Sequence, residues 1–137
     1  TSQQSSMDPQ GAQVVVEHPR AATGVEEWER TYATFLHLTL LTVHALMPVV
    51  PALAMWLIKR DRSAFLDDHG REAVNFQISL VLYALGATLV GFLTCGVGWW
   101  VLFPATYILG IVGMIRAAKD ANRGLFHRYP MCIRFVT

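Results

Sequence analysis

Apolar residues are gathered into three long runs along this chain, with short polar or charged segments between them. The runs cover about residues 33–58, 73–97 and 99–116, and the first contains no Asp, Glu, Lys or Arg. About 20 apolar residues are enough for a helix to cross the hydrocarbon core of a bilayer. The pattern therefore predicts an all-α integral membrane protein with about three transmembrane helices.

Two prolines, Pro48 and Pro51, interrupt the first apolar run. A bent spanning helix is the favoured interpretation, because neighbouring helices can satisfy the carbonyl groups that a proline frees in a membrane. A re-entrant hairpin is the alternative, in which each half of the run is too short to cross the bilayer.

The segments between and around the runs are polar. Residues 1–24 are predicted to form a polar tail outside the membrane, and residues 25–137 a single membrane domain. Residues 59–72 are predicted to be a charged loop. Residues 117–137 are predicted to be the C-terminal tail. From Leu125 to Thr137 basic residues alternate with apolar and aromatic ones, which favours a short segment at the membrane interface.

Composition and charge support a membrane location. The chain is 53% hydrophobic and 15% charged, against about 25% charged residues in an average soluble domain. Its net charge of +1 gives no reason to expect a nucleic-acid partner.

The distribution of basic residues predicts an orientation. Nine of the 11 Lys and Arg residues lie in the 59–72 loop or from Arg116 to the end of the C-terminal tail. The positive-inside rule places these segments in the cytoplasm of a bacterial inner membrane. With three spans the N-terminal tail is then outside, a placement that depends on the first run crossing the membrane.

Two histidines, His37 and His44, lie seven residues apart on the first run and share a helix face, about 10 Å apart. Ionisable groups inside a membrane are candidate functional groups, so either imidazole is a candidate ligand of a haem or chlorophyll, with His44 favoured because it lies deeper. The favoured interpretation is a neutral histidine bonded to a neighbouring helix. No metal site is expected, because no Cys or carboxylate lies on this run to complete a ligand set.

Charged and polar residues are densest before the second run. We interpret them as an electrostatic clasp, in which acidic residues pair with nearby basic ones, rather than as a metal or proton site. The predicted clasp comprises Arg60, Asp61, Asp67, Asp68, His69, Arg71, Glu72, Asn75 and Arg134.

Small residues at four-residue spacing on the second and third runs predict close helix contacts, within the chain or with a partner. They include Gly91, Thr106, Gly110, Gly113 and Ala117. Three polar residues on the second run, Asn75, Gln77 and Ser79, are interpreted as packing bonds rather than as a transport path.

Three parts of the sequence together resemble one protein family. They are Glu29–Ala33 with His37–Leu38, Trp56–Asp61 with Asp68–Gln77, and Ala121–Gly124 with Tyr129–Pro130 and Ile133–Phe135. The set resembles a bacterial membrane family of unknown function that is described as similar to the Tic-type chloroplast inner-envelope import subunit. The resemblance implies a fold and supplies no catalytic residues.

Signatures of catalysis, such as a nucleophile elbow, a phosphate loop or zinc-type Cys/His spacing, are absent from the sequence. We therefore expect a protein that is not an enzyme and has no resident cofactor other than bound lipid. The favoured function is an accessory or structural subunit of a larger bacterial membrane complex, respiratory or photosynthetic, with the bilayer and other membrane proteins as partners. The alternative is a component of a transport or protein-translocation system, which the family resemblance suggests.

Overall fold

A computed structural model describes residues 5–7, 13–15, 20–41 and 49–137 of the chain. Four helices make up most of it: α1 (Glu27–Leu38), α2 (Val50–Lys59), α3 (Ala64–Leu93) and α4 (Val97–Asn122), with the short 3-10 helix η2 (Arg60–Arg62) between α2 and α3. Two three-residue strands, β1 (Ser5–Met7) and β2 (Gln13–Val15), form an antiparallel pair before the helices.

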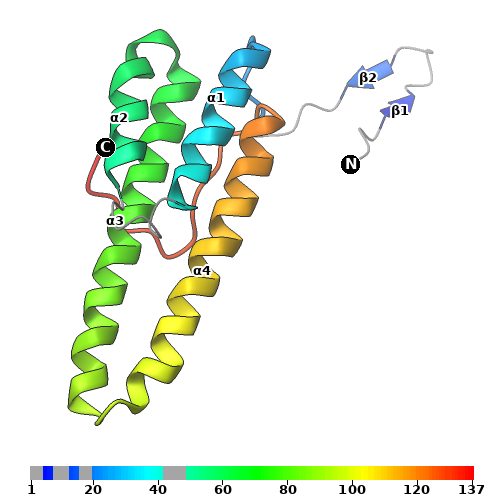
Figure 1. Ribbon diagram of the computed structural model, residues 1–137. Coiled ribbons are helices and arrows are strands. Elements are labelled where there is room, and N and C mark those ends of the chain that lie inside the picture. Colours follow the sequence, from blue (N-terminus) through cyan, green and yellow to red (C-terminus); the bar gives the residue numbers. More distant parts are fainter. Residues whose placement is uncertain (1–4, 8–12, 16–19, 42–48) are drawn as a thin grey trace.

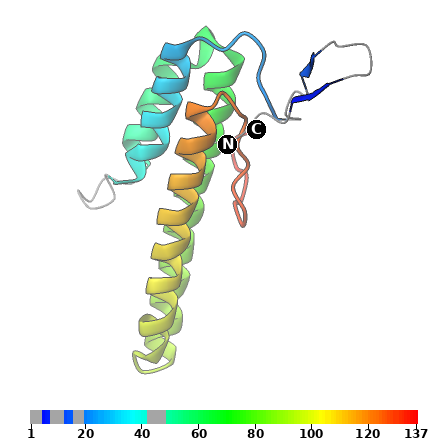
Figure 2. The same cartoon turned by 90° about the vertical axis from the view of Figure 1, so that its right-hand side faces the viewer.

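The two long helices α3 and α4 form an antiparallel pair that runs the whole height of the molecule (Figure 1). The turn between them, Thr94–Gly96, has positive φ angles at Cys95 (52°) and Gly96 (91°), a conformation that favours glycine. Figure 2 shows α1 and α2 on one side of this pair and the C-terminal segment on the other. The core lies in the half of the molecule where these layers overlap, which we call the layered half; Leu36, Trp56 and Phe76 are buried there.

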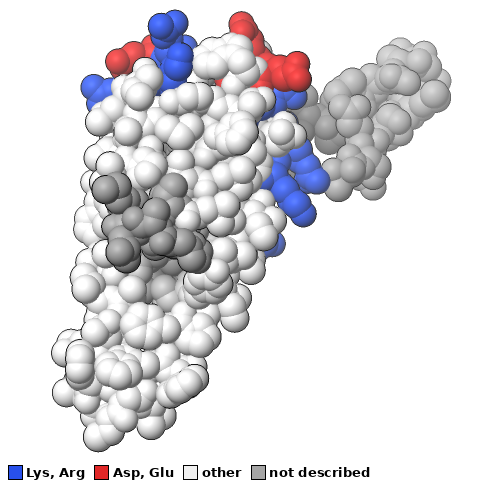
Figure 3. Space-filling model, viewed as in Figure 1, with Lys and Arg blue, Asp and Glu red and all other residues white. Residues whose placement is uncertain are grey.

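The structure contains two helices that are long and apolar enough to cross a membrane, α3 and α4. Only 28% of the most apolar window of each is buried within the chain, so most of their apolar surface faces outward. No charged residue occurs between Glu72 and Arg116, and the charged side chains gather at one end of the molecule (Figure 3). The charge-free part of α3 is about 30 Å long, which matches the hydrocarbon core.

Three membrane-spanning helices are not confirmed, because the first apolar run is not one helix among the described residues. It contributes α1, with 12 residues, and α2, with 10 residues, and each is too short to cross a bilayer. Proline accounts for the restart at α2. Pro51 lies in the first turn of α2, where its missing N–H costs no helical hydrogen bond, and Val49 before it has a φ of 74°.

The boundaries of the predicted loop and tail also differ from the structure. Residues 64–72, predicted to be part of a loop, are the first turns of α3, and α4 continues through Asn122 into the predicted C-terminal tail. Gly70 lies inside α3, and the Trp56 side chain packs directly against it.

Candidate functional site

A row of polar side chains along one face of α3 holds the C-terminal segment, residues 125–137, which we call the strap. The row comprises Asp68, Glu72, Asn75, Ser79 and Tyr83. Their spacing of three or four residues places them on one helix face. Each bonds to the part of the strap between Arg128 and Val136. The strap is therefore fastened to α3 along about four helical turns.

Glu72 is the charged centre of this row, and its side chain is 5% exposed. Its carboxylate accepts bonds from Arg134 Nε at 2.9 Å and from the backbone N–H of Tyr129 at 3.3 Å. The guanidinium of Arg128 binds both carboxylate oxygens of Asp68, at 2.6 and 2.7 Å. These bonds raise the pKa of Arg128 and of Arg134 above the ordinary value of arginine.

Asn75 makes the densest set of bonds to the strap. Its Oδ1 accepts the backbone N–H groups of Phe135, at 3.0 Å, and Val136, at 2.8 Å, while its Nδ2 donates to the carbonyl of Val136 at 2.8 Å. The side chain is 1% exposed. The side-chain amide of Asn75 therefore satisfies three backbone groups of the strap, which would pair with a neighbouring strand if the strap were part of a β-sheet.

The residues of the predicted clasp divide into separate groups in the structure. Asp68, Glu72, Asn75 and Arg134 meet at the strap. Asp67 instead bonds to Arg71 and to the indole N–H of Trp56, which ties α2 to α3. On the exposed η2 turn, Arg60 Nε lies 3.7 Å from Asp61 Oδ1, and this pair is away from the strap. The role of these residues in function stays a prediction.

A chain of buried hydrogen bonds passes between α3 and α4 and joins α1 to the strap. His69 Nε2 lies 3.0 Å from the carbonyl of Leu125, His69 Nδ1 lies 2.7 Å from His37 Nε2, and His37 Nδ1 lies 2.8 Å from the Tyr129 hydroxyl. A carbonyl only accepts, so His69 carries its proton on Nε2. His37 must then donate from Nε2 and accept from Tyr129 at Nδ1. One proton on each imidazole satisfies every bond of the chain.

The surroundings of His37 and Tyr129 favour these neutral forms. Burial, together with the neighbouring His69 and His127, holds the pKa of His37 well below its ordinary value. Burial, with Cys132 and Glu72 nearby, raises the pKa of Tyr129 well above its ordinary value. The Tyr129 hydroxyl therefore remains a hydrogen-bond donor to a neutral His37.

Stability is expected to depend on pH through His37. Because its pKa is lowered on folding, the unfolded chain binds a proton at His37 below about pH 6.5 and the folded protein does not. The contribution of neutral His37 is thus fully present above that pH and is lost as the pH falls. We expect the melting temperature in detergent to decrease from pH 7.5 to pH 5.

A His37→Phe variant provides the comparison for this pH series. We expect it to melt lower at pH 7.5, because His69 and Tyr129 lose a partner, but to show a shallower decrease with pH. An unchanged slope would contradict the role assigned to His37.

The structure bears differently on His37 and His44, the two predicted tetrapyrrole ligands. Both ring nitrogens of His37 already have partners within the chain, so neither is free for a haem or chlorophyll in this arrangement. His44 lies outside the described residues. Within the part of the chain that the structure describes, no three His, Cys, Asp or Glu side chains are grouped so that they could hold a metal ion.

Gln77 fastens the other side of the bundle. Its Oε1 accepts the backbone N–H of Val49 at 2.9 Å, and its Nε2 donates to Thr39 Oγ1 at 3.0 Å. The side chain is 2% exposed. It therefore bonds to the end of α1 and the start of α2 at the same level of α3.

The predicted packing residues lie mostly inside the chain. A Cβ atom on Gly110 would lie 3.2 Å from Leu80 of α3, and one on Gly113 would lie 2.6 Å from Phe76. Ala117 is fully buried, and Gly91 packs against Trp99. Thr106 instead lines a groove between α3 and α4.

That groove has a volume of about 750 Å³ and is almost entirely apolar. Its lining includes Leu80, Ala84, Thr88 and Phe103, which belong to the charge-free parts of α3 and α4. Leu40 and Gln77 close it at the end nearest to α1. The groove therefore opens at the level of the membrane interior.

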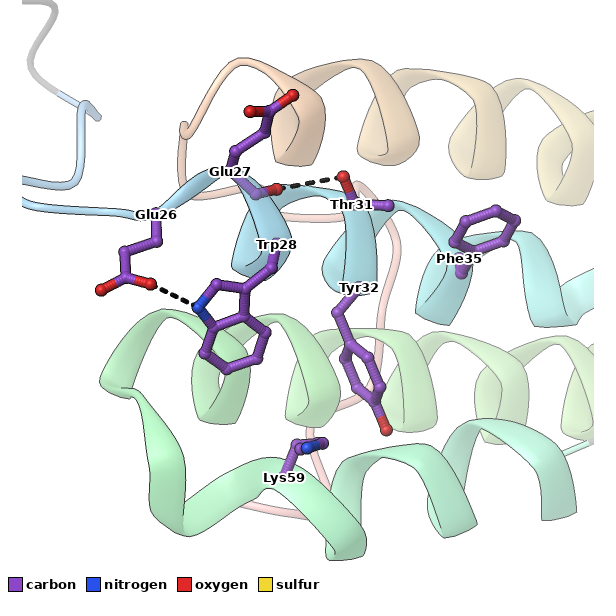
Figure 4. A pocket seen from close by; sticks show the side chains of 7 residues that line it. All are labelled: Glu26, Glu27, Trp28, Thr31, Tyr32, Phe35 and Lys59. Carbon is purple, nitrogen blue, oxygen red and sulfur yellow. Dashed lines mark hydrogen bonds between the residues drawn. The ribbon is translucent and has the colours of Figure 1, made fainter.

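A second cavity, of about 730 Å³, lies between the start of α1 and the end of α2. Figure 4 shows its side chains: the rings of Trp28 and Tyr32 point from α1 toward the end of α2, where Lys59 lies, and the ring of Phe35 points away from α2. The Lys59 ammonium lies 5.7 Å from the centre of the Trp28 ring. Aromatic and basic residues of this kind are typical of the membrane interface.

Several residues of the site were missed from the sequence. Tyr83, His127 and Tyr129 were assigned no role, and Ser79 was interpreted as a contact between spans. The usable signal was the spacing of residues 72, 75, 79 and 83, which places polar groups on one face of an otherwise apolar helix.

One protein-family model matches residues 28–136, well over half of the chain: the magnetosome magnetite crystal formation protein family, MamF/MmsF. The inferred resemblance to the Tic-type import subunit is therefore wrong. No curated protein and no solved structure matches the chain.

Proposed function

The chain belongs to the MamF/MmsF family of magnetosome magnetite crystal formation proteins, and from that membership we propose that it is a non-catalytic subunit of the magnetosome membrane. It supports crystal formation by packing against lipid and against other proteins of that membrane. In this proposal the larger complex to which the chain belongs is in the magnetosome membrane, and not the respiratory or photosynthetic complex that the sequence analysis expected.

The observation that carries this proposal is the division of the molecule into two different halves. In the layered half, the buried polar side chains bond to one another, as with Glu72 to Arg134 and His37 to Tyr129. In the other half, α3 and α4 present exposed apolar side chains, including Leu89, Phe92 and Ile108. A surface of this kind works through contact with lipid or with other helices.

The transport alternative has no specific support in the geometry. It relies on Glu72, Asn75 and Gln77 as a polar path. Each of these side chains is buried and bonded within the chain, Glu72 and Asn75 to the strap and Gln77 to α1 and α2. A path along them would require these bonds to break.

Complementation in a magnetosome-forming bacterium tests the proposal. The gene is deleted and restored as wild type, as Ala84→Trp, which fills the groove between α3 and α4, or as Leu89→Trp, an exposed position outside its lining. We expect smaller or fewer magnetite crystals, by electron microscopy, in the deletion strain and with Ala84→Trp, and restoration with Leu89→Trp. Immunoblots of isolated magnetosomes must show equal amounts of both variants.

Purification in mild detergent is the second part of the test. We expect the wild-type chain to co-purify with other magnetosome membrane proteins and the Ala84→Trp variant to lose at least one of them. A chain that runs alone, or crystals that are unchanged in the deletion strain, would refute the proposal.

A further inference from the structure

The entry to α1 and the exit from α4 are bonded to each other. The N–H of Ala22 donates to the carbonyl of Gly124 at 3.0 Å, and the N–H of Phe126 donates to the carbonyl of Arg20 at 2.9 Å. Arg20 also lies 3.6 Å from the carboxylate of Asp120 on α4. The chain therefore enters the helical bundle at the same end at which α4 leaves it.

The helices α1 and α2 run away from that end and back again. Tyr32 donates to the carbonyl of Met55 at 2.7 Å, so the two helices lie side by side. Their facing ends, at Thr39 and Val49, both bond to Gln77. Gln77 lies only about 6 Å along α3 from Ala73, where the charge-free part of α3 begins.

Their lengths agree with this path. A helix of 12 or 10 residues is about 18 or 15 Å long, roughly half of the 30 Å hydrocarbon core. The described parts of the first apolar run are therefore too short to reach the opposite surface from the charged end of the molecule, and their inner ends lie about 6 Å beyond the start of the charge-free part of α3.

The outer face of α2 has no partner within the described part of the chain. Val50, Leu53, Leu57 and Ile58 are exposed, and α2 carries no charge before Lys59. The helix α2 packs against α3, which also exposes apolar side chains such as Leu82 and Leu85. Lys59 and η2 end the apolar face of α2 at the charged end, as interfacial cations end a membrane segment. The chemistry that covers it is therefore that of lipid.

We propose that α1 and α2 form a hairpin that lies in one leaflet, its outer face covered by lipid, and returns to the side from which it came. The N-terminal tail, η2 and the strap then share one side of the membrane. Of the described residues, only the uncharged turn Thr94–Gly96, with the neighbouring Trp99 and Trp100, reaches the other side. The positive-inside rule makes the shared side the cytoplasm, which places the N-terminal tail opposite to the three-span prediction.

Thiol labelling in sealed vesicles of one orientation tests this topology, and the native Cys95 of the turn is one of its probes. The comparison uses three proteins that each have a single cysteine. The first keeps the native Cys95 and carries Cys132→Ala. The other two carry Ser2→Cys or Asp61→Cys, and in both of them Cys95 and Cys132 are replaced by alanine. We expect a membrane-impermeant maleimide to label Ser2→Cys and Asp61→Cys from the same side and Cys95 only from the opposite side. A three-span chain gives another pattern, with Ser2→Cys and Cys95 labelled together, and that result would overturn the proposal.

A nitroxide series tests the contact of α2 with lipid. The labels are placed at Asp61→Cys, Ile58→Cys and Val50→Cys, with Leu82→Cys on α3, an exposed position about 14 Å along α3 from Ala73, as the mid-membrane reference. We expect the ratio of oxygen to nickel-chelate accessibility to rise in the order Asp61, Ile58, Val50, Leu82. Water-like ratios at Ile58 and Val50 would show that this face is not covered by lipid.

These measurements concern the path of the chain and not its role in crystal formation. They use purified protein in liposomes or inverted membrane vesicles, so their failure would leave the proposed function standing, and failure of the crystal assay would leave the topology standing.

Discussion

Replacing Asn75 by alanine is expected to release the end of the strap and to lower the free energy of unfolding by about 2–3 kcal/mol, since three backbone groups of Phe135 and Val136 lose their partner together. The vacated site is buried, and alanine cannot refill it. Hydrogen exchange of the protein in detergent, followed by mass spectrometry, should show strongly increased exchange in residues 129–136, and thermal unfolding gives the loss of stability.

Asn122→Ala is the matched control for this change. Asn122 is exposed at the end of α4, so the same substitution there should alter stability by no more than about 0.5 kcal/mol and leave the strap protected. Equal protection of the strap in Asn75→Ala and wild type would contradict the view that Asn75 anchors it.

Replacing Gly70 by alanine is expected to force α2 away from α3. A Cβ atom at this position would lie 2.8 Å from the Cβ of Trp56 and closer still to its ring. A Cβ is fixed to the backbone, so α2 itself must shift, and the bond from Trp56 to Asp67, 2.8 Å long, is strained. Overpacking of this kind costs about 1–3 kcal/mol, even though alanine favours a helix by about 1 kcal/mol. Thermal unfolding and the tryptophan emission maximum measure the effect.

Gly86→Ala separates packing from helix propensity. Gly86 lies on the same helix, and a Cβ there would meet no atom within 4 Å. This variant should be as stable as wild type or more stable. If Gly70→Ala unfolds at the same temperature as Gly86→Ala, the close approach of Trp56 to α3 is wrong.

The two long helices could be predicted because lipid imposes a strict rule on sequence. A spanning helix must keep charge out of the hydrocarbon for about 20 residues, and residues 73–115 obey it. The helix starts were less predictable. Asp67 and Asp68 look like the end of a loop, but in the structure they lie in the first turns of α3, where the helix dipole favours acidic residues.

The first apolar run shows where hydropathy alone fails. A hairpin with apolar faces on both sides has the same composition as a spanning helix, so its 26 residues fit either structure. Pro48 and Pro51 are the local signals for the break, and proline is also tolerated inside spanning helices. The bonds of Gln77 to Thr39 and to Val49 favour the hairpin that we propose, and the sequence gives no indication of these contacts.

Part of the candidate site could be predicted from the sequence. Charge complementarity identified Glu72 and Arg134, 62 positions apart, as members of one cluster. It did not identify which pairs form, because the strap reverses its direction near Met131, which has a φ of 55°, and this reversal brings Arg134 back to Glu72. The link from His37 to Tyr129 likewise depends on how side chains of α1 and the strap meet between α3 and α4, which the sequence does not reveal.

The uncharged turn between α3 and α4 bears on how the protein is made. Residues 73–115 carry no charge, so inserting the α3–α4 pair transfers only Thr94–Gly96 and its apolar neighbours through the hydrocarbon. Moving a single Arg or Asp to the centre of a membrane costs at least about 2.5–3.5 kcal/mol, and the α3–α4 pair avoids that barrier. The pair is thus suited to enter a bilayer in one step as a helical hairpin, without a translocated domain to carry across.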